Sequence, residues 1–199
     1  GDPQQLKPVI LLDELTNRKL RRKYHVADEY DYRENSIYKT YLACDAVSDE
    51  ILLRNHYRCN KKIIDFNNKK YYNSKLQVQS DSRERQPLVY VNVDGGPGDM
   101  KNTSPAEVEE IMRYAGENPD KSIAVITPFV NQRILIERGI KENGFEHVVC
   151  GTVHAFQGDE KDVVLFSTAL SDRTGKGTYD WLKNNKELIN VATSRAKDK

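Results

Sequence analysis

The second half of the chain alternates short, continuously apolar runs with amphipathic runs, and this alternation limits the possible folds more than any other feature. The apolar runs indicate strands at residues 122–127, 147–151 and 162–168. A helical pattern between the first two spans 131–142 and stops at Asn143-Gly144. Strands that are apolar throughout are typical of parallel sheets buried on both faces. The pattern therefore predicts an α/β fold with a parallel sheet flanked by helices.

Turn and capping residues indicate three further elements in this half. Residues 88–93 indicate a strand that ends in the breaker-rich segment 94–98. Ser104 and Glu107 have the spacing of a capping box, which predicts a helix from there to about Tyr114. A loop with two glycines precedes a last helix, predicted from about Trp181. Ligands of parallel sheets bind beyond the carboxyl ends of the strands, so we expect a site in the residues that follow these ends.

The first half of the chain is predicted to be helical. Apolar residues recur at helical spacing in 36–53, which favours one or two helices. A second amphipathic helix is predicted over 59–72, with Ile63, Phe66 and Tyr71 on its buried side.

Charge in this half is concentrated in two runs. Residues 18–25 (RKLRRKYH) carry five cations and are followed by an acidic stretch at 28–34. Such a run is either a solvated helix face or a patch for nucleic acid. The formal net charge of the 199 residues is only +1, so any nucleic-acid binding must come from local grooves.

Composition excludes several classes of protein and of site. The three cysteines are too few and too scattered for a disulfide framework or a zinc site, which favours a cytoplasmic location, or a nuclear one in a eukaryote. No His, Cys or carboxylate cluster has metal-ligand spacing, so we expect no metal site. We expect no membrane association, because no apolar run approaches spanning length.

The chain contains no GxxxxGK[ST] phosphate loop, and residues 175–178 (GKGT) have the wrong spacing for one. That loop provides the backbone N–H groups and the lysine that hold the β- and γ-phosphates of ATP. We therefore expect these 199 residues alone neither to bind ATP tightly nor to hydrolyse it.

Four segments resemble helicase motifs and occur in the order of superfamily 1. They are 1–8 (GDPQQLKP, similar to motif III), 53–59 (LRNHYRC, motif IV), 151–164 (GTVHAFQGDEKDVV, motif V) and 189–197 (INVATSRAK, motif VI). Thr193 and Ser194 depart mildly from the usual motif VI. Segments 53–59 and 151–164 most resemble subgroup B, in the branch of the nonsense-decay RNA helicase and its DNA-helicase relatives.

The resemblance implies a RecA-like fold of the P-loop NTPase type and a division of the chain. Residues 1–52 would be motif III and a helical linker from a first motor domain. Residues 53–199 would be the second RecA-like motor domain, truncated after motif VI. The implied cofactor is ATP with Mg²⁺, held mainly by the first motor domain of the same polypeptide, which would be a partner of this one.

The resemblance also implies catalytic roles for three residues. Arg58 and Arg195 would be arginine fingers, because a guanidinium stays charged and binds phosphate oxygens with its planar fork. Gln5 would sense the γ-phosphate. For both arginines an ordinary structural role is the alternative, such as a salt bridge at a helix start for Arg58.

Three more residues would contact the nucleotide or organise its site. Tyr57 would stack on adenine, with a core tyrosine as the alternative. Gly158 would let the backbone approach the nucleotide closely. Glu160 would accept a hydrogen bond from the ribose or organise the arginines, and a plain turn is the alternative for this segment.

The candidates for nucleic acid lie at strand ends, where hydroxyl groups hold phosphates and an exposed aromatic ring stacks on bases. They are Thr127, Pro128, Phe129, Thr152 and His154. The alternatives are a core role for Phe129 and a hydrogen-bonding role for His154, for which we expect no acid–base function.

The predicted function is therefore that of a helicase motor domain that moves along single-stranded nucleic acid, with DNA slightly favoured over RNA. An RNA helicase of the same superfamily is the closest alternative. A non-catalytic nucleic-acid-binding module and a nuclease with its own site are the alternatives from other classes.

Overall fold

The computed structural model describes residues 2, 4–6, 10–44, 51–156 and 158–199. The chain divides into two compact units, Gly1–Leu53 and Arg54–Lys199.

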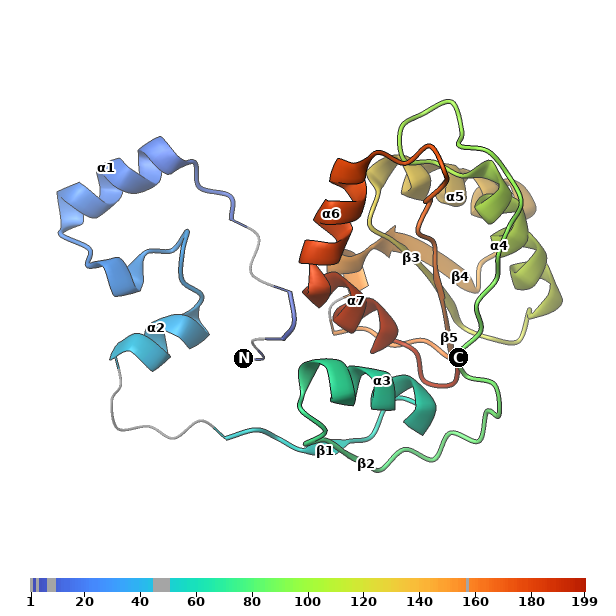
Figure 1. Ribbon diagram of the computed structural model, residues 1–199, viewed down its shortest axis with the longest axis horizontal. Coiled ribbons are helices and arrows are strands. Elements are labelled where there is room, and N and C mark those ends of the chain that lie inside the picture. Colours follow the sequence, from blue (N-terminus) through green and yellow to red (C-terminus); the bar gives the residue numbers. More distant parts are fainter. Residues whose placement is uncertain (1, 3, 7–9, 45–50, 157) are drawn as a thin grey trace. The chain divides into compact units, whose positions relative to one another are not determined.

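The first unit contains α1 (Glu14–Tyr24), the 3₁₀ turn η1 (Asp28–Tyr30) and α2 (Ile37–Cys44) (Figure 1). Asp13 caps α1 by accepting a hydrogen bond from the backbone N–H of Thr16 at 2.9 Å. In the basic run, Arg21 forms ion pairs with Asp31, at 2.5 Å, and with Asp28. Part of the basic run is therefore used inside the unit, to hold the acidic stretch against α1.

Helix α2 covers the first part of the predicted 36–53 helix. Residues 45–50 lie outside the described residues, and 51–53 are not helical. The apolar side chains Ile37, Tyr41 and Leu42 of α2 are exposed, and no residue of this helix is buried.

A parallel three-stranded sheet is the centre of the second unit and confirms the predicted fold class. Its strands are β3 (Ile123–Thr127), β4 (Val148–Thr152) and β5 (Val163–Phe166), in the order β4-β3-β5. In β3, Ile123 lies opposite Val148 of β4 and Val163 of β5. All residues of β3 are buried, as its continuous apolar sequence predicted for a central parallel strand.

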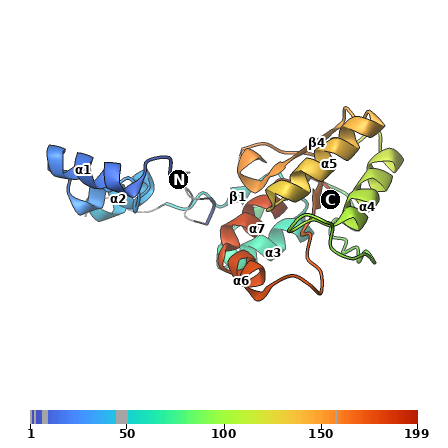
Figure 2. The same ribbon diagram turned by 90° about the horizontal axis from the view of Figure 1, so that it is seen from above.

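Helices cover both faces of this sheet (Figures 1 and 2). On one face, α4 (Pro105–Glu117) and α5 (Val130–Asn143) pack against Ile123, Val125 and Val163. On the other face, α3 (Lys61–Tyr71) and the segment at Ala196 pack against Val164. Neighbouring β5 residues thus belong to opposite cores, because successive side chains of a strand point to opposite faces.

Helix α4 begins as predicted but is longer and lacks half of its capping box. The Ser104 hydroxyl accepts from the backbone N–H of Glu107 at 3.3 Å, and the helix continues three residues past Tyr114. The Glu107 carboxylate does not turn back to Ser104; it accepts a 2.5 Å hydrogen bond from Ser167 just beyond β5. The backbone N–H of Ser104 donates instead to the side chain of Gln132 at 2.8 Å.

The last helix and the strand at 88–93 were predicted wrongly. Helix α6 (Lys176–Asn184) starts five residues before Trp181, and α7 (Lys186–Thr193) follows after a break at Asn185. Residues 88–93 make no ladder with any described segment, and strand structure requires such a partner however apolar the sequence is.

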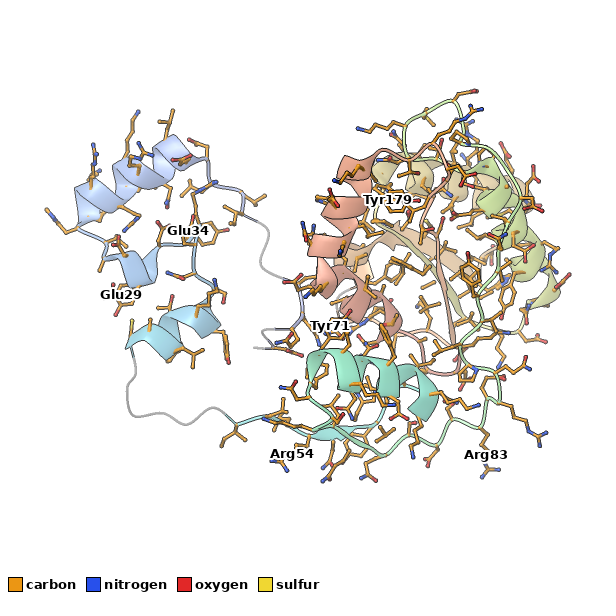
Figure 3. The ribbon with its side chains drawn as sticks, viewed as in Figure 1. Glu29, Glu34, Arg54, Tyr71, Arg83 and Tyr179 are labelled. Carbon is orange, nitrogen blue, oxygen red and sulfur yellow. The ribbon has the colours of Figure 1, made fainter. Side chains whose placement is uncertain are left out.

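The buried side of α3 also differs from the predicted one. Ile63 is buried, but Phe66 is exposed and Tyr71, labelled in Figure 3, is half-buried. Ile64 and Asn67 take the inner positions. The helix presents a polar residue to its core because Asn67 pairs there with residues of α7.

Two further pairings position the segments before α3 and after α7. Strands β1 (Asn55–His56) and β2 (Gln77–Val78) form a small parallel sheet of their own, next to exposed Arg54 (Figure 3). Ala196 bridges to Lys161 in parallel, so the chain after α7 runs beside the start of β5. Among the described residues no helix has the length and apolar character needed to cross a membrane.

Candidate nucleotide and nucleic-acid sites

Arg58 is placed by the turn between β1 and α3. Its Nε donates to the Glu160 carboxylate at 2.7 Å, and its Nη1 donates to the Ser194 carbonyl at 3.2 Å. The adjacent Cys59 is fully buried and its thiol donates to the same carbonyl at 3.4 Å. Burial raises the pKa of the Cys59 thiol to about 12, so it remains a neutral donor. Arg58 thus joins the turn before α3 to the segments around Glu160 and Ser194.

Arg195 reaches the same place from the other end of the unit. It follows α7, and its backbone carbonyl accepts from the N–H of Lys161 at 3.1 Å. Its guanidinium donates to the Val191 carbonyl at 3.1 Å and to the Ser194 hydroxyl at 2.9 Å, and only 3% of the residue is exposed. The structure therefore brings Arg58 and Arg195 together around Ser194, although 136 residues separate Arg58 from Ser194 in sequence.

The resulting arginine cluster, Arg58, Arg195, Lys197 and Glu160, has more positive than negative charge. Lys197 forms the second ion pair of Glu160, with its ammonium 3.0 Å from the carboxylate. Hydrogen bonds from Arg58 and Lys197 lower the pKa of Glu160, which keeps it ionised. Burial, followed by the nearby charge of Arg58, lowers the pKa of Arg195. Arg58 and Lys197 contact Glu160, while Arg195 is near enough to Arg58 for their charges to repel, so the approach of an anion would relieve this repulsion.

The other nucleotide candidates differ in their surroundings. Tyr57 is exposed at 68%, so it is not a core tyrosine. Gly158 has φ of +95°, and open space surrounds the position where a Cβ would lie. A left-handed backbone in that turn explains the glycine without a ligand. Glu160 contacts Arg58 directly, as one of its two predicted roles requires.

Gln5 belongs to the first unit, and its predicted role as a phosphate sensor stays a prediction. There its side-chain amide donates to the Asp2 carboxylate at 3.2 Å, and its backbone N–H donates to the Asp2 carbonyl at the same distance.

A groove of about 910 Å³ opens at the carboxyl ends of β3 and β5, where the sequence predicted a ligand site. Its walls are the segments 97–103, 128–131 and 169–178, together with Trp181 of α6. We call it the strand-end groove. Two predicted nucleic-acid residues, Pro128 and Phe129, line it, and Phe129 is largely buried beneath the surface.

The remaining nucleic-acid candidates lie elsewhere around the strand ends. Thr127 is fully buried, and its hydroxyl accepts from the backbone N–H of Phe129 at 3.3 Å. Thr152, half-buried, ends β4 opposite Thr127. His154 is exposed in the 3₁₀ turn η2 (Val153–Phe156) that follows.

Sequence reasoning did not select several residues that the structure places at these sites. Lys197 was part of the motif VI match but received no role, although it shares Glu160 with Arg58. Lys101, Arg173 and Trp181 line the strand-end groove. Trp181 had one available signal, since it is the single tryptophan of the chain.

The residues of the arginine cluster suit the phosphates of a nucleotide better than they suit its Mg²⁺. The arginine cluster offers guanidinium and ammonium donors of the kind that bind phosphate oxygens. In the part of the chain that the structure describes, no group of three His, Cys, Asp or Glu residues could hold a metal ion.

His56 beside the arginine cluster gives a pH-dependent prediction. Its Nε2 accepts from the backbone N–H of Cys59 at 3.0 Å, and burial, then Arg58 and Arg195, lower its pKa to about 4 from 6.5. Between pH 4 and 6.5 the unfolded chain therefore binds a proton that the folded chain refuses. The free energy of unfolding should fall as the pH drops through this window, by on the order of 2 kcal/mol after allowance for solvent screening.

Denaturant unfolding of the 199-residue chain across pH 3–7, compared between the wild type and His56→Gln, measures this effect. Glutamine keeps an acceptor near the Cys59 N–H but does not titrate. The variant should lack the slope, and an identical slope in both proteins would assign it to other groups.

Comparison with known proteins completes the description of these sites. Residues 33–199 match the family described as "AAA domain" (AAA_12). The whole chain is 26% identical to the mouse protein named 3'-5' exoribonuclease HELZ2, and 99% of it is 27% identical to mouse RNA helicase Mov10l1. A part covering 71% is 27% identical to the Regulator of nonsense transcripts 1 homolog of Drosophila melanogaster.

The chain spans 7%, 19% and 14% of the length of these three relatives, respectively. The family match covers far more than half of the chain and includes the arginine cluster and the strand-end groove. The chain belongs to the AAA-domain family of superfamily 1 helicases, in the nonsense-decay branch, and is a RecA-like part of the helicase motor.

Proposed function

We propose that this chain supplies the second motor domain of an ATP-dependent helicase that moves along single-stranded nucleic acid. Arg58 and Arg195 act as arginine fingers on ATP–Mg²⁺ held by the first motor domain of the same polypeptide. Gln5 senses the γ-phosphate. Closure of the two motor domains around ATP, and reopening after hydrolysis, moves the strand.

The observation that carries this proposal is the convergence of two arginines from distant segments beside one carboxylate. Arg58 and Arg195 both donate to Ser194, and Arg58 also donates to Glu160. A cluster of this kind suits a phosphoryl group, whose oxygens gain stabilisation from guanidinium groups as charge shifts during transfer. Glu160 would hold Arg58 in position until the phosphate replaces it.

The other nucleotide contacts follow from exposure and position. Exposed Tyr57 is the candidate for stacking on adenine, and Gly158, with open space where a Cβ would lie, is the candidate for close backbone approach. Pro128 in the strand-end groove, with Thr152 and exposed His154 nearby, provides the proposed contacts to the strand, and the more buried Thr127 and Phe129 support them from beneath.

Among the three relatives compared, the names that specify a nucleic acid or transcript point to RNA. They give no support to the preference for DNA drawn from the motifs. The proposal is therefore for single-stranded nucleic acid, with RNA and DNA compared directly.

ATP hydrolysis by the full-length helicase that carries this chain is the test. A homopolymeric single strand of RNA or DNA should stimulate hydrolysis severalfold, while the 199-residue chain alone should hydrolyse no ATP because it contains no phosphate loop. A full-length protein without ATPase activity, with or without strand, would favour a non-catalytic binding module. Metal-dependent cleavage of the strand by the chain alone would favour a nuclease.

A further inference from the structure

The strand-end groove contains an exposed indole that no proposed role accounts for. Trp181 on α6 is 44% exposed, and its ring centroid lies 6.0 Å from that of Phe129 with 38° between the planes. Phe129 is only 8% exposed, so it supports the indole from the protein side. The aromatic surface that the groove offers to a ligand therefore belongs to Trp181, and Phe129 is its backing.

The groove also contains cations that lack carboxylate partners. Lys101 and Arg173 line it from two different segments, and neither pairs with a carboxylate of any described residue. The one acidic residue of the lining is Asp99. Hydroxyl and amide side chains such as Asn131 and Thr178 complete the walls. Exposed aromatic surface beside unpaired cations suits a ligand that has both flat bases and phosphates.

The shape of the groove is set before a ligand arrives. Gln132, fully buried beneath it, accepts from the backbone N–H of Ser104 at 2.8 Å and donates to Ser167 at 3.0 Å. These bonds join the segments before α4 and after β5 to α5. Ala169 on the rim has φ of +46°, a left-handed conformation that costs alanine about 1 kcal/mol and persists only where the surroundings impose it.

We propose that Trp181 is the stacking surface for a base of the bound single strand and that Lys101 and Arg173 hold the neighbouring phosphates. This inference rests on the proposed function and adds to it the element, α6 with the loop before it, that contacts the strand. Stacking on an indole accepts any base, and two separate cations follow a backbone rather than read a sequence. A motor that moves along a strand needs such contacts without sequence preference.

The affinity of the full-length helicase for a labelled single-stranded oligonucleotide, measured by fluorescence anisotropy, tests the proposal. Trp181→Ala should weaken binding roughly tenfold or more, and Trp181→Phe should restore most of it. Tyr179→Ala is the matched control, because Tyr179, labelled in Figure 3, lies on the same helix but does not line the groove, and it is 45% exposed. Equal losses for Trp181→Ala and Tyr179→Ala would overturn the proposal.

Salt dependence tests the two cations separately from the indole. Lys101→Ala and Arg173→Ala should each make the plot of log affinity against log salt shallower by about 0.7, the value for one contact to a single-strand phosphate. Trp181→Ala should leave that slope unchanged. Unaltered slopes in both cation variants would reject their assigned role.

Indole emission gives a direct readout, since Trp181 is the one tryptophan of the 199-residue chain. Emission should fall when anisotropy shows the strand bound, because a stacked base quenches the indole. If the Trp181 emission of the chain is unchanged while anisotropy shows the strand bound, Trp181 does not stack on a base.

The outcomes also separate this inference from the proposed function. Strand-stimulated ATP hydrolysis that survives Trp181→Ala, with unchanged affinity, would reject the inference and leave the motor intact. Hydrolysis that no strand stimulates in the wild type would reject the motor itself.

Discussion

Replacing Arg195 by alanine in the full-length helicase is expected to lower ATP turnover about 10³-fold, as for a lost arginine finger. The expected reason is that charge developing on the transferred phosphoryl oxygens loses its guanidinium. Arg195→Lys should recover only part of the rate, because an ammonium keeps the charge but not the planar fork. Steady-state hydrolysis at saturating ATP and strand measures both variants.

The structure adds a condition to this experiment. Arg195 is buried and donates to the Val191 carbonyl and the Ser194 hydroxyl, so alanine removes internal hydrogen bonds as well as a finger. We expect a loss of roughly 1–3 kcal/mol in the free energy of unfolding. Rates must therefore be compared at a temperature where both proteins are folded.

A surface arginine supplies the matched control. Arg113→Ala removes an exposed guanidinium that pairs with Glu110 and Glu117 on α4, far along the chain from either motif arginine, and should leave turnover unchanged. Near-normal turnover in folded Arg195→Ala would mean that Arg195 is a structural residue of the α7 end. Arg58 would then be the remaining finger candidate.

The second large effect is expected in stability, from Asn67→Ala. Asn67 is fully buried on α3 and donates to the carbonyl of Asn190 at 3.1 Å and to its side chain at 2.9 Å. The side-chain oxygen of Asn67 accepts from the Thr193 hydroxyl at 2.9 Å. Removing the amide leaves buried polar groups of α7 without these bonds, which should cost about 3 kcal/mol.

Thermal and denaturant unfolding of the 199-residue chain measure this loss, and the midpoint should fall by roughly 6–12 °C. Lys69→Ala is the control, since Lys69 is exposed two residues along the same helix. A difference below about 1 kcal/mol between the two variants would show that α3 and α7 associate through their apolar residues alone. A loss of about 3 kcal/mol in the free energy of unfolding would show that the Asn67 hydrogen bonds to α7 hold α3, and with it Arg58, beside the segment of Arg195.

Local signals in the sequence were sufficient for the elements whose character is set by consecutive residues. The apolar runs gave β3, β4 and β5, and Ser104 and Gly144 marked helix ends through their own backbone geometry. The same signals failed at 88–93, where apolar character indicates a strand but no described neighbour forms the ladder. They also failed for Phe66, because helical periodicity does not show which polar residue will find a buried partner.

The sequence by itself determined the fold class and the family, because strand patterning and ordered motifs are properties of consecutive residues. It named Arg58, Glu160 and Arg195 singly. Only the tertiary structure decided that they meet: the chain after α7 runs parallel beside the start of β5, and Arg58 donates to the carbonyl of Ser194, 136 positions away in sequence. The strand-end groove has the same origin: Lys101, Arg173 and Trp181 share it because the ends of parallel strands lie at one edge of the sheet.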